Sequence, residues 1–123
     1  MRVKVGIVIV AVLHLGFAFA EIFRWEDVIA LLLGLKEATD TTAIKLLLLN
    51  QGSYNAFFAI GLLAALSGLV PAVQRKALVV FCLASLAAAG LVGLATVQHL
   101  FFLIQLVPAA GVLAYILFKP EEV

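Results

Sequence analysis

The sequence has few of the charged residues that a water-soluble domain needs on its surface. Only 12% of its 123 residues are charged and 66% are hydrophobic, whereas a soluble domain carries about 25% charged and about 45–50% apolar residues. We therefore predict that most of the chain lies in lipid. The net charge of +1 provides no basic field, so we expect no nucleic-acid partner.

Residues for cross-links, metals and cofactors are also scarce. The single cysteine, Cys82, has no partner for an internal disulfide, and its apolar neighbours indicate a small buried packing residue. Two histidines and one cysteine without ligand spacing do not predict a metal site. The sequence has no Gly-rich phosphate loop and no Ser/His/Asp arrangement. We therefore predict neither a metal nor a cofactor.

What the sequence does have is four apolar stretches, each long enough for a membrane span of about 20 residues. Pro71 ends the second stretch, and the basic residues 73–76 are expected to form a loop before the third. A tight turn at residues 96–99 would join the last two spans into an antiparallel hairpin. Between the first two spans, a shorter apolar segment flanked by charges is typical of a helix that lies at the membrane surface or caps the bundle.

The predicted fold class is therefore all-α, an integral membrane four-helix bundle with a short interfacial helix between the first two spans. We place the spans at about residues 3–23, 44–68, 77–95 and 100–118, and the interfacial segment at about 26–36, in a single domain of residues 1–123.

The first apolar stretch also has the pattern of a secretory signal peptide. Arg2 and Lys4 precede an apolar centre, and residues 18–20 form an Ala-Phe-Ala cleavage pattern. His14 in the middle of the apolar centre, and the lack of a polar mature domain, favour a retained helix. We expect this segment to remain as the first span.

Four spans place both termini on one side of the membrane. Five basic residues belong to that side and three to the other: Arg2, Lys4, Arg75, Lys76 and Lys119, against Arg24, Lys36 and Lys45. Because basic residues accumulate on the cytoplasmic side, we expect cytoplasmic termini in a bacterial cytoplasmic membrane.

Polar side chains interrupt the spans mainly in the half of the membrane away from the termini. An amide without a partner in hydrocarbon is costly, so three amides and a phenol within positions 50–55 call for a reason. Two titratable residues seven positions apart share one face of the first span. We expect a polar pocket open toward the outer leaflet. The candidates are His14 and Glu21 as acid/base groups, and Asn50, Gln51, Tyr54, Asn55 and Gln105 as ligand-binding groups.

The same residues also have purely structural interpretations. Amides cross-link membrane helices, with each bond worth roughly 0.6–2 kcal/mol. Glu21 can instead reach the headgroups or pair with Arg24, and a neutral His14 can bond to Tyr54 or Asn50. Pro108 is expected to kink the last span and free a carbonyl group beside Gln105, and His99 is expected to be solvated in its turn.

Several of these segments resemble one family of small bacterial membrane proteins, which is known as domain of unknown function family 1304. The resemblance covers nearly the whole chain, and its most specific part is the Asn-Gln-Gly-Ser-Tyr-Asn segment. The segments that carry it are residues 13–15, 21–25, 50–61, 90–96 and 105–109. The resemblance implies a four-helix integral membrane protein whose first helix is not cleaved, and it implies no reaction.

Three functions remain open from the residues. The first is a pocket for a small lipophilic ligand, in a binding protein or in a membrane enzyme with His14 and Glu21 as its acid and base. The second is a proton-coupled small transporter that uses Glu21. The third is a structural or assembly subunit whose polar residues only join helices. Besides membrane lipid, a second copy of the chain is an expected partner, through the small residues Ser85, Ala89 and Gly93.

Overall fold

The computed structural model describes residues 2–33 and 41–119, which are almost entirely helical. The helices are α1 (Arg2–Phe23), α2 (Trp25–Leu33), α3 (Thr41–Ser67), α4 (Ala72–Val97) and α5 (Phe101–Phe118). All but α2 are long and apolar enough to cross a membrane. The predicted all-α fold, with four spans and a short helix between the first two, is confirmed.

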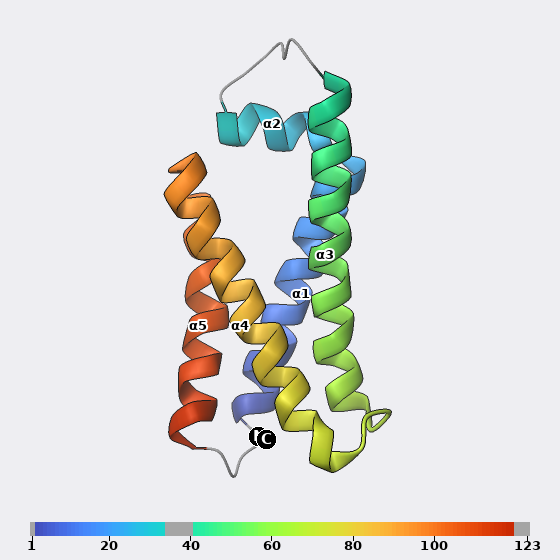
Figure 1. Ribbon diagram of the computed structural model, residues 1–123, viewed down its shortest axis with the longest axis vertical. Coiled ribbons are helices and arrows are strands. Elements are labelled where there is room, and N and C mark those ends of the chain that lie inside the picture. Colours follow the sequence, from blue (N-terminus) through green and yellow to red (C-terminus); the bar gives the residue numbers. More distant parts are fainter. Residues whose placement is uncertain (1, 34–40, 120–123) are drawn as a thin grey trace.

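The four long helices surround a common core. Helix α1 packs against α3 and α5, and α4 packs against the same two helices, so that α1 and α4 lie diagonally across the bundle. The start of α1 and the end of α5 lie at one end of the molecule, here called the terminal end (Figure 1). Helix α2 lies across the opposite end, here called the α2 end. The two ends of the bundle therefore differ: α2 covers one, and the other holds the start of α1 and the end of α5.

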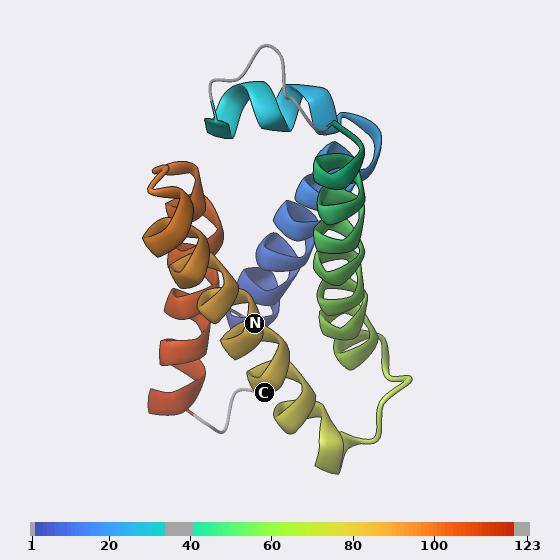
Figure 2. The same ribbon diagram turned by 45° about the horizontal axis from the view of Figure 1, so that its top comes forward.

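The apolar core is concentrated toward the terminal end. Buried residues of α1 recur every three or four positions, which is the stripe expected of a helix with one buried face. The core residues of α3 and α4 come mainly from the halves nearest the terminal end: Ala59, Leu62, Ala65, Val79, Cys82, Leu83 and Leu86. Toward the α2 end, the hairpin of α4 and α5 diverges from α1 and α3 (Figures 1 and 2).

Glycines set the closest approaches between helices. A Cβ atom at Gly90 of α4 would lie 2.9 Å from the backbone nitrogen of Leu106 in α5, and one at Gly93 would overlap the ring of Phe102. Small residues at such positions allow the backbones of membrane helices to pack closely. Gly93, which the sequence suggests for contact with a second copy, therefore contacts α5 of its own chain.

Two expectations about the connections are wrong. Residues 73–76 are not a loop, since α4 begins at Ala72 directly after Pro71; a proline suits the start of a helix, and no residue after it breaks the helix. The turn before α5 is also shorter than predicted, because α4 continues through Val97. Gln98 ends α4 with a left-handed backbone (φ 57°), and its N–H donates to the carbonyl oxygen of Leu94.

The remaining connection contains residues 34–40, which lie outside the described residues. They include residues 34–36, the last three of the predicted interfacial segment. Helix α3 begins at Thr41, three residues earlier than predicted, and α5 runs without interruption through Pro108.

We predict that Gly90→Ala destabilises the bundle. The added methyl group would meet backbone atoms of Leu106 that cannot rotate away, and overpacking of this kind costs about 1–3 kcal/mol. Gly16→Ala is the matched control, because a Cβ atom there meets no atom within 4 Å, and the better helix propensity of alanine gives up to about 1 kcal/mol. Thermal unfolding in detergent measures both changes. A stability for Gly90→Ala equal to or above that of the wild type would contradict the packing.

Candidate functional site

A groove of about 540 Å³ lies at the α2 end, where the two helix pairs diverge. Its volume falls within the range of roughly 300–1,000 Å³ that is typical of small-molecule sites. Each of the five helices contributes to its walls. The lining residues are Glu21, Val28, Ile29, Leu32, Ile44, Leu47, Leu48, Gln51, Ala89, Val92, Gly93, Thr96, Val97 and Phe102.

The carboxylate of Glu21 is fixed in the groove wall by a neighbouring helix. The side-chain nitrogen of Asn55 donates to Oε2 of Glu21 at 2.7 Å, and Asn55 is itself only 2% exposed. This bond joins α1 to α3 near one end of the groove. Because the amide of Asn55 binds one oxygen of the carboxylate, α3 helps to hold the side chain of Glu21 in place.

Gly52 makes this arrangement possible. A Cβ atom at Gly52 would lie 2.8 Å from Cγ1 of Ile22 and 3.1 Å from both the Ala18 carbonyl oxygen and Cβ of Glu21. Any larger residue would push α3 away from α1 at the level of Glu21. The glycine within the Asn-Gln-Gly-Ser-Tyr-Asn segment therefore brings Asn55 within hydrogen-bonding distance of the carboxylate.

Few other polar groups line the groove. Gln51 lies one helical turn from Asn55 on α3, and the hydroxyl group of Thr96 donates to the Val92 carbonyl oxygen at 2.8 Å. Of the alternatives for Glu21, pairing with Arg24 is not observed, because Arg24 forms its ion pair with Asp27, three residues further along the exposed surface. The groove thus combines apolar walls with a carboxylate at one side, which is an arrangement suited to an apolar molecule with one polar group.

His14 and Gln105 lie in the interior instead of in the groove. His14 is fully buried, its Nδ1 is 2.8 Å from the Val10 carbonyl oxygen, and Gln105 is 3% exposed. The rings of Phe17 and Phe101 pack with centroids 5.2 Å apart, which sets the register of the antiparallel helices α1 and α5. His14 precedes Phe17 by three residues and Gln105 follows Phe101 by four, so both lie one turn from this contact, at a similar level.

Each of these two side chains has a buried nitrogen without a hydrogen-bond partner, which is Nε2 in both cases. With Nδ1 of His14 protonated and donating to Val10, its Nε2 is an acceptor, whereas Nε2 of Gln105 is a donor. The two groups are chemically complementary on facing helices. A polar group beside either nitrogen, such as water or a ligand hydroxyl, would satisfy it.

Asn50 and Tyr54 point elsewhere, because both are exposed on the outer surface of α3, and Tyr54 is 52% exposed. Successive residues of a helix are rotated by about 100°, so the neighbours Gln51 and Asn55 face inward while Asn50 and Tyr54 do not. Neither residue lines the groove, so the predicted ligand-binding role of Asn50 and Tyr54 does not apply to it. His99 is half-buried, and its Nδ1 accepts a hydrogen bond from the Phe101 amide at 3.1 Å.

Sequence reasoning missed the contribution of α2 to the groove. Val28, Ile29 and Leu32 cover it, and Ile29 is only 6% exposed. Their i, i+1 and i+4 spacing on a short helix with acidic residues at its start was the available signal. This spacing indicates a helix with one apolar face. The apolar face of a helix on the membrane surface faces lipid, whereas that of α2 faces the groove.

We predict that Gln105→Leu stabilises the protein. A buried donor without a partner costs about 1–3 kcal/mol, and leucine removes it while conserving most of the volume. The expected result is a higher midpoint of thermal unfolding in detergent. A lower midpoint would show that the amide holds a bound molecule or water that leucine cannot retain.

A family model described as Protein of unknown function (DUF1304) matches residues 8–117. No curated protein and no solved structure matches the chain.

Proposed function

Since the chain belongs to the DUF1304 family of proteins of unknown function, its role must be argued from its own geometry, and we propose that it binds a small lipophilic molecule in the membrane. The observation that carries this proposal is the groove at the α2 end, in which the Asn55-bound carboxylate of Glu21 is the main polar group among apolar side chains.

The chemistry of the walls indicates what kind of molecule would fit. Leucine, isoleucine and valine side chains from α2, α3 and α4 would contact an apolar body. In its ionised form the carboxylate of Glu21 would only accept hydrogen bonds, and one of its oxygen atoms already accepts from the amide of Asn55. The ligand would therefore present a hydroxyl or amine donor to Glu21, with Gln51 completing its orientation.

Gln51→Leu and Asn50→Leu form a pair of variants that tests the groove. The two amides are adjacent on α3, but Gln51 lines the groove and Asn50 is exposed. We expect Gln51→Leu and Glu21→Gln to lose a co-purifying small molecule that native mass spectrometry detects in the wild type. We expect Asn50→Leu to retain it. Loss in Asn50→Leu alone would place the ligand on the outer surface of α3 and overturn the proposal.

The same variants separate ligand binding from the two other functions. If the polar residues only join helices, Glu21→Gln lowers the unfolding temperature while every variant retains the same molecules. If the protein is a proton-coupled transporter, Glu21→Gln abolishes proton-dependent flux in proteoliposomes while the ligand still binds. Binding is favoured over transport because Glu21 lies at the end of α1 and is fixed by Asn55.

We further propose that the termini lie on the cytoplasmic side of a bacterial cytoplasmic membrane. The support is the excess of basic residues at the terminal end, where α1 begins, α5 ends and α3 connects to α4. In this orientation the groove lies in the outer half of the bilayer, where a lipophilic molecule can enter it from the lipid. A pocket for an apolar ligand in this position needs no large aqueous domain.

A further inference from the structure

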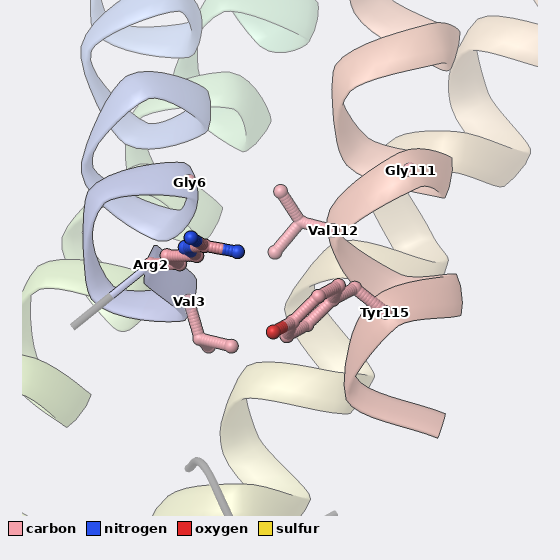
Figure 3. Close-up of a pocket in the computed structure, with 6 residues that line it drawn as sticks. All are labelled: Arg2, Val3, Gly6, Gly111, Val112 and Tyr115. Atoms are coloured by element: carbon pink, nitrogen blue, oxygen red, sulfur yellow. The ribbon is translucent and has the colours of Figure 1, made fainter. Parts of the chain in front are cut away.

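A second cavity, of about 220 Å³, lies between α1 and α5 at the terminal end. Figure 3 shows the side chain of Arg2 and the ring of Tyr115 on its two sides, with the hydroxyl group of Tyr115 directed toward α1. The remaining lining residues are Val3, Gly6, Gly111 and Val112. This cavity is far from the groove in the fold, and its lining is independent of the proposed ligand site.

From this cavity we propose that the terminal end binds the headgroup of one anionic phospholipid. The volume lies below the roughly 300–1,000 Å³ of sites that enclose a whole small molecule. A headgroup with a phosphate is an occupant of suitable size, because its acyl chains remain in the bilayer. The occupant is therefore a lipid of the surrounding membrane instead of a soluble molecule.

The polar groups of the cavity suit a phosphate. Arg2 is exposed at the start of α1, and a guanidinium group binds phosphate oxygens through two parallel hydrogen bonds. The six lining residues include no acidic side chain. Basic pockets between membrane helices are a known mode of recognition for anionic headgroups.

The surrounding charge points to the same occupant. The terminal end carries five of the eight basic residues, and Lys4 and Lys119 are both exposed beside the cavity helices. The sequence also places Glu121 and Glu122 after α5, outside the described residues. The basic residues outnumber them, so an anionic lipid is favoured over a zwitterionic one.

Two glycines give the cavity its shape. A Cβ atom at Gly6 would lie 2.8 Å from a Val112 methyl group, so α1 and α5 approach each other closely at the wall of the cavity. A Cβ atom at Gly111 would meet no atom within 4 Å. A leucine there can fill the cavity without disturbing the packing of the bundle.

The test is native mass spectrometry of the purified full-length chain in detergent, titrated with dioleoyl phosphatidylglycerol or with dioleoyl phosphatidylcholine. We expect one phosphatidylglycerol molecule to bind more tightly than phosphatidylcholine. Arg2→Gln should weaken it about fivefold, as expected for the loss of one basic side chain near an anionic headgroup. Gly111→Leu should remove the preference for phosphatidylglycerol.

Two controls match these variants. Lys4→Gln makes the same change of charge two residues away but outside the cavity lining, and Gly16→Leu adds the same side chain at another glycine with open surroundings. Both should keep the preference. Equal losses for Arg2→Gln and Lys4→Gln would indicate a general charge effect and overturn the site. Equal binding of both lipids by the wild type, or an unchanged preference in Gly111→Leu, would overturn it as well.

Discussion

The close contact between α1 and α3 at Gly52 is the constraint on which the α2 end of this protein depends. The glycine lets the backbones approach at the level of Glu21, and the hydrogen bond from Asn55 then joins the two helices. Both partners lie in helices that are long and apolar enough to cross a membrane. A polar group without a partner there is costly. The hydrogen bond gives both the Asn55 amide and the Glu21 carboxylate a partner.

This pairing also explains why the groove lies where it does. With α1 and α3 held together at the α2 end, the hairpin of α4 and α5 packs against them mainly near the terminal end, where the apolar core is concentrated. The hairpin diverges toward the α2 end (Figure 2). The short helix α2 covers the space that results, and its apolar side chains complete the walls.

Much of this architecture follows from the sequence because it depends on long-range composition. The lengths of the apolar stretches and the placement of Pro71 predict four spans, whereas the exact ends of α4 depend on local backbone choices at Ala72 and Gln98. The polar residues are harder to place. Helix lengths and the rise per residue do not predict that Glu21 and Asn55 lie at the same level. Glu21 is near the end of α1 and Asn55 is well inside α3, yet the two side chains are hydrogen-bonded.

The direction of each side chain could not be predicted either. Asn50 and Tyr54 are residue types that often bind ligands, yet both are exposed because of the rotation of α3 about its axis. The contact of Gly52 with α1 sets that rotation. Likewise, the burial of His14 and Gln105 comes from the packing of α1 and α5 in the bundle, where the rings of Phe17 and Phe101 are in contact. Such contacts join residues far apart in the sequence, and a single sequence does not reveal them.

The attachment of α2 has a consequence for exchange between the groove and its surroundings. Among the described residues, this helix packs mainly on α1 and α3, and the ammonium group of Lys45 lies 5.6 Å from the ring centre of Trp25 at its start. Elements with so few buried contacts open locally at a small fraction of the global unfolding free energy. If the groove holds a ligand as proposed, detachment of this nine-residue helix would set the residence time of the ligand, while the bundle beneath it stays intact.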